Sequence, residues 1–489
     1  MIQLNSDQEF VVQHAVDWYF NSPEQIFQYD GPPGSGKSVV LNEIVRRIGL
    51  DVASEVAPMS FIGAASLIMR KNGLFTARTA HSWIYELVEV PRRDIHGNVM
   101  YRDNGTIIMD RQFRPRHFLD PNIKLIIVDE AYCMPRSMRP TLQNYGIKIL
   151  ACGDSHQLPP VNDAPAFLVD GKVYHLTQIM RQAGRDDIIF LANRAMEGMS
   201  LPSGFYGNSL VIEREDLTDD MMLWADAVIC GTNNTRDAIN RHIRYLRGHK
   251  SLLPEYGEKV VCRNNNWDIE AITDDGNTMN LVNGLIGTVV NQPSIETYDP
   301  YKHTFNLSFR CESAKCMFNC NASYEYMIAG HNDRMMFKDM SNRSIHGQFF
   351  EFAYAITCHI AQGSQFDNVI YIEETLGKDL QPALNLVGAT RAVKHLIYVN
   401  NNHHRFNQFT VDPNEAQYIA SSQKRIQHII NKKENEWRKS HKSAYSLSNN
   451  VELKKQIKDA TFSRMGWIYS DNHSPVPRNV QDHPMVKTK

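Results

Sequence analysis

Blocks of apolar residues alternate with blocks of amphipathic residues along most of this chain. Short runs rich in apolar and β-forming residues occur at 25–29, 124–128, 148–152, 227–230, 368–372 and 395–399. Between them, stretches such as 39–45, 63–69 and 234–247 place apolar residues at helical spacing. Strands that alternate with helices predict an α/β fold built on parallel sheets.

Two regions depart from this alternation. Residues 90–116 are polar and basic, and the β-forming segments 99–101 and 106–109 flank Asp103-Asn104-Gly105, which predicts a β-hairpin inserted in a first domain. Residues 258–347 contain short strand patterns at 259–262, 285–290 and 304–309, which predict a small β-barrel-like insertion. We therefore predict a first domain over 1–185, a second domain over 186–257 and 348–402, and a C-terminal extension over 403–489.

Composition sets the remaining bounds. The 489 residues are 42% hydrophobic, enough for several compact domains. The net charge is −2, so binding to a polyanion would need a local basic patch. No run is long and apolar enough to cross a bilayer, and the N-terminus lacks a signal-peptide pattern. We expect a soluble cytoplasmic protein, of a bacterial cell or a phage-infected host, without a membrane partner.

Cysteine spacing and the C-terminal extension each have two interpretations. Cys311, Cys316 and Cys320 cluster, but they lack a paired Cys-x-x-Cys and a fourth ligand, so small residues of a β-rich region are favoured over a zinc site. The extension is basic, which is typical of a solvated helix with a flexible tail. The alternative is a basic arm that contacts nucleic acid or a partner.

Gly31-Pro32-Pro33-Gly34-Ser35-Gly36-Lys37-Ser38 fits the phosphate-binding loop G-x-x-x-x-G-K-[ST]. It lies between a predicted strand and a predicted helix, as the motif requires. Backbone N–H groups of the loop would surround the phosphates of ATP, and the helix N-terminus would add a favourable dipole. Lys37 would contact the β and γ phosphates, and Ser38 would hold Mg²⁺ through its hydroxyl.

Polar residues also follow the next predicted strands. Asp129 and Glu130 end an apolar run, where Asp129 would reach Mg²⁺ and Glu130 would orient or deprotonate the attacking water. Gln157 follows another strand and could sense the γ-phosphate. Arg181, on spacing alone, is typical of a solvated helix face or a salt bridge.

Taken in order, the motifs resemble superfamily 1 helicases, most closely the RecD-like branch with the phage Dda-type enzymes. The resemblance covers roughly residues 4–400. It rests on the phosphate-binding loop, on Asp129-Glu130-Ala131 and on further motifs spread through both predicted domains. These are Gly153-Asp154 with Gln157-Leu158-Pro159-Pro160-Val161, Met180-Arg181-Gln182, Cys230 to Arg236, Asn283 to Gly287, Tyr354 to Ser364 and Ala389 to Ala392.

The resemblance implies two RecA-like domains with ATP in the cleft between them. Arg391 of the second domain and Arg181 would stabilise charge on the transferred γ-phosphoryl group, and Gln8 would read the adenine edge. Single-stranded DNA would cross the tops of both domains and the hairpin would split the duplex. The residues implied in nucleic-acid contact are Pro58, Thr79, His81, Tyr101, Thr357, His359 and Gln362.

We therefore expect an ATP- and Mg²⁺-dependent DNA helicase that acts on single-stranded DNA and on fork or overhang duplexes. The resemblance implies 5′ to 3′ movement and a role in replication, recombination or repair, with single-strand-binding or replication proteins as partners. An RNA helicase and a translocase that remodels nucleoprotein complexes with little unwinding are the alternatives. A P-loop module without nucleic acid is a third, and it would show no stimulation by a polynucleotide.

Overall fold

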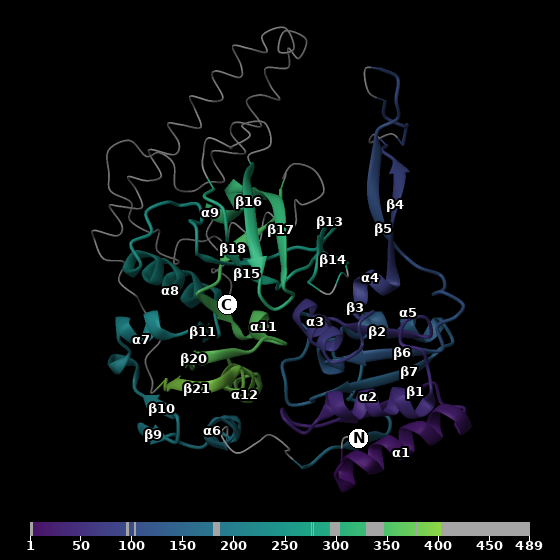
Figure 1. Cartoon of the computed structure of the whole chain (residues 1–489), viewed down its shortest axis with the longest axis horizontal. Helices are drawn as coiled ribbons and strands as arrows, with labels where there is room; N and C mark the ends of the chain where they lie inside the picture. Colours follow the sequence, from purple (N-terminus) through teal and green to yellow (C-terminus); the bar gives the residue numbers. More distant parts are fainter. Residues whose placement is uncertain are drawn as a thin grey trace, which may run out of the picture.

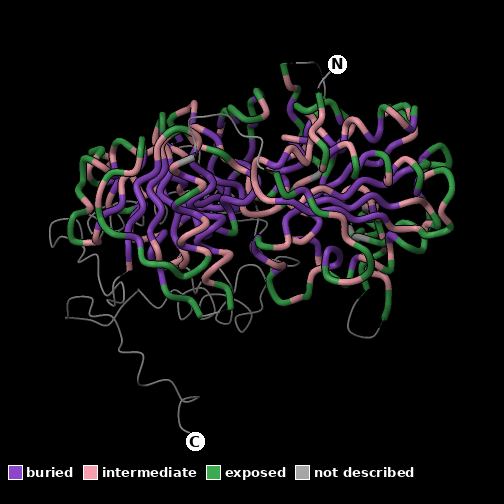
Figure 2. Tube along the Cα trace, turned by 90° about the horizontal axis from the view of Figure 1, so that it is seen from below, coloured by how far each residue is buried: buried purple, intermediate pink, exposed green. Residues whose placement is uncertain are grey.

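The computed structural model describes residues 3–93, 97–101, 104–178, 186–274, 276, 278–293, 304–328, 347–377 and 379–401. Two α/β domains lie side by side, a β-rich insert stands above the second, and a hairpin projects from the first (Figure 1). Buried residues form a band of strands through each domain (Figure 2). Arg181 and the predicted extension over 403–489 lie outside the described residues.

The first domain is built on a six-stranded sheet in the order β3-β2-β6-β7-β1-β8, and every neighbouring pair is parallel. Its strands are β1 (Ile26–Asp30), β2 (Val56–Ser60), β3 (Arg78–Thr79), β6 (Leu125–Asp129), β7 (Lys148–Gly153) and β8 (Val173–His175). The apolar residues of β6 and β7 are buried on both faces, as expected for central parallel strands. This confirms the predicted α/β class.

Helices cover both faces of the first sheet. They are α1 (Ser6–Asn21), α2 (Lys37–Ile48), α3 (Gly63–Lys71), α4 (Ala80–Ile84) and α5 (Arg139–Asn144), with 3₁₀ turns η1 (Ala131–Cys133) and η2 (Arg136–Met138). Helix α1 begins with a reciprocal capping box, in which Asn5 accepts from the Gln8 backbone N–H and the Gln8 side chain accepts from the Asn5 N–H. This motif fixes the start of the chain over the sheet.

The hairpin is longer than the sequence predicted. Strand β4 (Tyr85–Pro91) follows α4 directly and pairs with β5 (Met109–Pro115) from Tyr85 opposite Pro115 to Pro91 opposite Met109. Farther out, bridges join Arg93 to Val99 and Tyr101 to Ile107. The predicted strands at 99–101 and 106–109 therefore belong to the outer end of one long arm, which begins before residue 90.

The second domain has a sheet in the order β19-β11-β20-β21-β10-β9, parallel except for the antiparallel edge strand β9. Its strands are β9 (Gly204–Tyr206), β10 (Ser209–Ile212), β11 (Ala227–Cys230), β19 (Ala355–Thr357), β20 (Phe366–Ile372) and β21 (Ala392–Val399). Its helices are α6 (Asp186–Met196), α7 (Asp219–Trp224), α8 (Asn233–Leu246), α11 (Cys358–Ala361) and α12 (Gln381–Ala389), with the 3₁₀ turn η3 (Arg214–Asp216). The two domains are RecA-like in architecture.

The insert contains an antiparallel sheet in the order β17-β16-β15-β12-β18 and a separate β13-β14 hairpin. Its elements are β12 (Lys259–Cys262), β13 (Asn266–Ile272), β14 (Thr278–Leu281), β15 (Ile286–Val289), β16 (Thr304–Cys311), β17 (Cys316–Ser323), α9 (Tyr324–Ile328) and β18 (Phe350–Phe352). Because β18 pairs with β12, Phe350–Phe352 extend the sheet of the insert a few residues past the predicted boundary at 348.

Helix α3 connects the first domain to the insert. Its Leu67 is buried in the hydrophobic cluster of the insert, together with Met279 and Val282. All eight cysteines are buried and none forms a disulfide, and the described residues contain no cluster of potential metal ligands. Within the same described ranges, no helix combines the length and apolar character needed to span a bilayer.

Candidate nucleotide and nucleic-acid sites

The phosphate-binding loop connects β1 to α2 at the C-terminal edge of the first sheet. Gly34 and Gly36 have φ angles of 90° and 85°, a region in which residues with a Cβ are strained, so glycine is needed at both positions. The N–H of Gly31 donates to the Gly153 carbonyl over 3.1 Å, which ties the loop to the end of β7. The loop therefore has the strand, loop and helix geometry that the sequence predicted.

Lys37 is the first residue of α2 and its side chain turns back over the loop. The ammonium nitrogen Nζ donates to the carbonyl oxygens of Gly31 at 2.7 Å and Pro32 at 3.3 Å. The hydroxyl of Tyr29 donates to the Lys37 carbonyl over 3.0 Å and fixes the start of the helix. The cation thus lies within the curve of the loop, where a phosphate chain would be bound.

Gln8 contacts the loop rather than the solvent. Its amide nitrogen Nε2 donates to the Ser35 carbonyl over 3.0 Å, while Oε1 accepts from the Asn5 N–H in the capping box of α1. A Cβ on Gly36 would lie 2.4 Å from that nitrogen, so glycine is the residue that leaves room for Gln8. The structure places Gln8 beside the loop, and the reading of adenine by Gln8 stays a prediction.

Ser38 and Asp129 line one pocket between α2 and the end of β6. Burial raises the pKa of the Asp129 carboxyl, although its Oδ1 atom accepts from the Glu130 N–H at 2.9 Å and from the Cys152 thiol at 3.3 Å. A hydroxyl and a half-buried carboxylate that line one pocket are ligands that suit Mg²⁺. The residues present therefore fit the ion that the sequence predicts.

Glu130 has a backbone conformation that is uncommon for a residue with a side chain. Its φ of 51° and ψ of 44° place it in the left-handed region at the start of η1. Strain of this kind is often found at functional residues. Burial, reinforced by the charge of Asp129, raises the pKa of the Glu130 carboxyl to about 7. A carboxyl with this pKa is well matched to proton transfer near neutral pH.

Asp154 belongs to the Gly153-Asp154 motif, but the sequence pattern assigned it no role of its own. It is 1% exposed, and Oδ1 accepts from the His156 N–H at 3.0 Å. Oδ2 has no hydrogen-bond partner among the residues that the structure describes. The negative charge of Asp154 helps to raise the pKa of Glu130. Its place directly after β7, three residues before the buried Gln157, was the available signal.

Arg391 reaches the same site from the second domain. Its guanidinium is buried and donates to the Val387 carbonyl at 3.0 Å, the Ser364 carbonyl at 3.3 Å and the Thr390 hydroxyl at 3.0 Å. Burial lowers the pKa of Arg391, whereas the charge of Glu130 opposes that shift. The structure therefore brings Lys37, Asp129, Asp154 and Arg391 within electrostatic range of Glu130, and Ser38 lines a pocket with Asp129.

The residues implied in nucleic-acid contact separate into exposed and buried sets. Exposed or half-exposed side chains belong to Tyr101, His359 and His81. His81 stacks on Tyr85, with ring centroids 5.7 Å apart. The buried residues are Pro58, Thr79, Thr357 and Gln362. Thr79 precedes α4 and Thr357 precedes α11, so corresponding helix starts of the two domains carry these hydroxyls.

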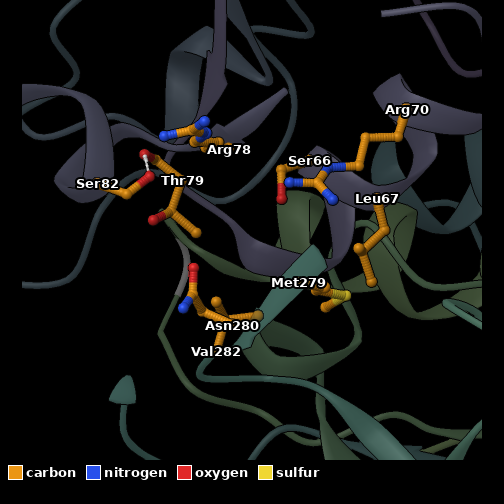
Figure 3. Close-up of a pocket in the computed structure, with 9 residues that line it drawn as sticks. All are labelled: Ser66, Leu67, Arg70, Arg78, Thr79, Ser82, Met279, Asn280 and Val282. Carbon is orange, nitrogen blue, oxygen red and sulfur yellow. Dashed lines mark hydrogen bonds between the residues drawn. The ribbon is translucent and has the colours of Figure 1, made fainter. Parts of the chain in front are cut away.

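A polar crevice separates the first domain from the β13-β14 hairpin, and in Figure 3 Thr79 and Asn280 face each other across it. The Thr79 hydroxyl is buried and has no hydrogen-bond partner within the described part of the chain. Arg70 lies beside Ser66 in the same view and donates to the Thr278 carbonyl at 3.1 Å. Polar groups and arginines at this junction are suited to an anionic backbone.

Comparison with known proteins agrees with this division of the chain. A family model described as "AAA domain" matches residues 3–201, and one described as "UvrD-like helicase C-terminal domain" matches residues 352–399. The "ATP-dependent DNA helicase PIF1" of Saccharomyces cerevisiae is 22% identical over 351 residues, which cover 62% of this chain. The chain spans only 38% of the length of that relative.

Solved structures with a similar fold include two Pif1 helicases. One, from Candida albicans, is 18% identical, with a TM-score of 0.44 and coverage of 82% of this chain and 96% of the other. A Bacteroides Pif1 bound to single-stranded DNA is 15% identical, with a TM-score of 0.46 and coverage of 86% and 98%.

The fold and the phosphate-binding loop are those of a two-domain P-loop protein, in which Arg391 of the second domain lies within electrostatic range of Glu130 of the first. The matched segments correspond to the two RecA-like domains, and the ordered motifs connect them. The two family-model matches and the Pif1 relative make the chain similar to superfamily 1 helicases of the branch that contains the RecD-like and Pif1 proteins.

Proposed function

We propose that this protein is an ATP-dependent DNA helicase that moves 5′ to 3′ along single-stranded DNA and couples ATP hydrolysis to strand separation. The observation that carries the proposal is the cleft itself, where Glu130 of the first domain and Arg391 of the second affect each other's pKa. A site assembled from two domains makes hydrolysis depend on domain closure. The polarity and the preference for DNA rest on the family resemblance.

Each side chain of the cleft has a separate role in the proposed hydrolysis. Lys37 and the N–H groups of the loop hold the triphosphate, and Glu130 accepts the proton of the attacking water. Gln157 senses the γ-phosphate, and the planar guanidinium of Arg391 stabilises charge that develops on the γ-phosphoryl oxygens. Asp154 keeps the Glu130 carboxyl basic through like-charge repulsion.

Mg²⁺ would be held by the Ser38 hydroxyl and the Asp129 carboxylate. When bound, the ion neutralises charge on the β and γ phosphates. Asp129 is half-buried beside Glu130 and its pKa is raised by desolvation, so its charge is costly without a cation, which is the physical reason for pairing this carboxylate with a metal.

The proposed strand path runs over the tops of the two domains. His81 and Thr79 lie at α4 in the first domain, and His359 and Thr357 lie at α11 in the second. A strand held at both helices would be moved when the cleft closes and opens. The β4-β5 hairpin projects beside this path from the end of α4, where a duplex would arrive (Figure 1).

The experiment is steady-state ATP hydrolysis by the full chain, without polymer and with single-stranded DNA or RNA. Unwinding of duplexes with only a 5′ or only a 3′ overhang follows in the same preparation. Lys37→Ala is the matched control, and it should bind single strands normally but lack turnover. Strong stimulation by DNA with unwinding from 5′ overhangs alone is the expected result.

The other outcomes each reject a defined part of the proposal. Unwinding of RNA but not DNA duplexes would identify an RNA helicase. Stimulation by DNA without strand separation would favour a translocase that remodels nucleoprotein complexes. If neither polymer changed the rate of ATP hydrolysis, the proposed strand path would be rejected and only the nucleotide site would stand.

A further inference from the structure

Gln362 lies at the interface between the domains rather than on the surface. It follows α11 of the second domain and is 5% exposed. Its amide nitrogen Nε2 lies 3.4 Å from the Cys133 sulfur and 3.4 Å from the Leu158 carbonyl oxygen, both of the first domain. The Cys133 thiol in turn donates to the same carbonyl over 3.4 Å. One amide therefore contacts two separate loops of the other domain.

Both of these loops carry proposed catalytic groups. Cys133 ends η1, the turn that begins at Glu130, and its N–H donates to the Glu130 carbonyl at 3.0 Å. Leu158 directly follows Gln157 in the chain. The amide of Gln362 thus connects the loop of the proposed base to the loop of the proposed phosphate sensor, and it does so only while the two domains are in contact.

The residues after Gln362 make further contacts in this region. Gly363 has a φ of 74°, and a Cβ there would lie 2.9 Å from the Ala65 backbone nitrogen of α3. The carbonyl of Ser364 accepts from the Arg391 guanidinium at 3.3 Å. Three consecutive residues therefore contact the base and sensor loops, helix α3 and the arginine of the second domain.

This segment is also attached to the proposed strand path. The N–H of Gln362 donates to the Cys358 carbonyl at 3.2 Å and closes the turn of α11, which exposes His359. A displacement of α11 by a bound strand would move the Gln362 amide with it. Gln362 directly follows α11 and is hydrogen-bonded to its first residue, so the helix and the amide should move together.

We infer that Gln362 is a positioning residue for ATP hydrolysis, which holds the Glu130 and Gln157 loops in register when the domains close, and which does not itself contact the strand. The inference rests on the proposed function for the reaction that it serves. Its geometric basis is the pair of contacts to Cys133 and Leu158. A direct role of Gln362 in strand binding, as the family resemblance implied, would need an accessible amide, and this one is buried.

The test compares Gln362→Leu, which keeps the size of the side chain but removes its donors, with the unmodified protein. We expect kcat for ATP to fall about 10- to 100-fold, because small displacements of catalytic groups have effects of this size. The KM for ATP and the dissociation constant for single-stranded DNA should change less than about twofold, since neither ligand loses a contact. The fall in kcat should appear with and without DNA.

Cys133→Ala removes the sulfur from the other side of the contact. If the two groups act together, the double variant Gln362→Leu with Cys133→Ala should be no slower than the slower single variant, because effects of residues that act as a unit are not additive. Cys133→Ser restores a donor to the Leu158 carbonyl and should recover part of the rate. Binding of a fluorescent ADP analogue to each variant reports whether the nucleotide site remains folded.

The outcomes separate this inference from the proposed function. Normal kcat in Gln362→Leu with a weakened dissociation constant for DNA would overturn the inference and assign Gln362 to the strand. If the unmodified protein hydrolyses ATP without stimulation by DNA, the proposed strand path fails, yet a reduced kcat in Gln362→Leu would still support positioning. Independent, multiplicative losses in the Gln362 and Cys133 variants would also overturn the inference.

Discussion

Arg391 of the second domain and Glu130 of the first lie close enough across the cleft for each to shift the pKa of the other. The guanidinium lowers the pKa of the carboxyl, and the carboxyl raises that of the guanidinium. The negative charge of Asp154 acts to raise the pKa of both Glu130 and Arg391. The domain interface is therefore part of the proposed catalytic site.

Removing the guanidinium should separate nucleotide binding from hydrolysis. Arg391→Ala is expected to bind ATP but to hydrolyse it about 1,000-fold more slowly, the scale reported for arginines that stabilise phosphoryl transfer. Arg391→Lys should also be slow, because an ammonium lacks the planar fork. Single-turnover hydrolysis and binding of a fluorescent nucleotide measure the two steps. Arg310→Ala, at an exposed position of the insert, is the control and should behave normally.

The raised pKa of Glu130 predicts the pH dependence of turnover. A base must be ionised, and the pKa of about 7 means that the ionised fraction falls as the pH drops below that value. We expect kcat/KM for ATP to fall about tenfold per pH unit once the pH is well below 7, as for titration of a single base. Glu130→Gln should have negligible turnover at every pH.

The raised pKa of Glu130 also predicts that stability falls as the pH rises, whereas turnover increases. A carboxyl whose pKa is higher in the folded protein than in the unfolded chain stabilises the fold in its protonated form, and that contribution is lost as the pH rises towards 7. Thermal unfolding of Glu130→Gln should therefore depend less on pH between about 5 and 7 than that of the unmodified protein. If kcat/KM of the unmodified protein did not fall as the pH drops below 7, the assignment of Glu130 as the base would be contradicted.

Local patterns predicted the strand, loop and helix geometry of the candidate nucleotide site. The glycines of the loop, Lys37 and Asp129 act through local geometry, since a loop and the end of a strand fix them. Local sequence patterns do not show which elements far apart in the chain lie close together in space. The family resemblance placed Gln362 in strand contact, but its amide is buried and contacts Cys133 at the end of η1.

The insert shows the same limit of local sequence patterns. Its strands were visible as β-forming runs, yet the pairing of β18 with β12 depends on a return of the chain after many residues, which local patterns do not reveal. The hairpin was recognised from Asp103-Asn104-Gly105 at its outer end. Its long base pairs Tyr85 with Pro115, and both residues lie outside the predicted strands 99–101 and 106–109.

The exposed ring of Tyr101 makes the hairpin testable independently of the cleft. Tyr101 lies at the outer end of the arm and is 61% exposed. Loss of one stacked base is worth about 1–3 kcal/mol, so Tyr101→Ala should slow duplex unwinding several-fold, and by more than it slows ATP turnover. Strand-displacement and ATPase assays on the same forked substrate measure the ratio. Tyr256→Ala, which removes an equally exposed ring at 68%, should leave that ratio unchanged.

A buried ion pair should determine how firmly the insert is attached to the second domain. Glu258, which directly precedes β12, accepts from the guanidinium of Arg244 in α8 at 2.7 and 2.9 Å, and its side chain is fully buried. Glu258→Gln would leave the arginine without its counter-charge. Removing one partner of a buried pair typically lowers the free energy of unfolding by about 3–5 kcal/mol.

The matched control is an ion pair of similar length at the surface. Lys394 and Asp367 join β21 to β20 at 2.7 Å, with side chains 62% and 49% exposed. Solvent screens such pairs, so Asp367→Asn should lower the free energy of unfolding by less than about 1 kcal/mol. Urea unfolding followed by tryptophan fluorescence and by circular dichroism measures both variants. Equal losses would mean that burial does not set the strength of the Arg244–Glu258 pair, and that the insert is held to the second domain mainly by its apolar contacts.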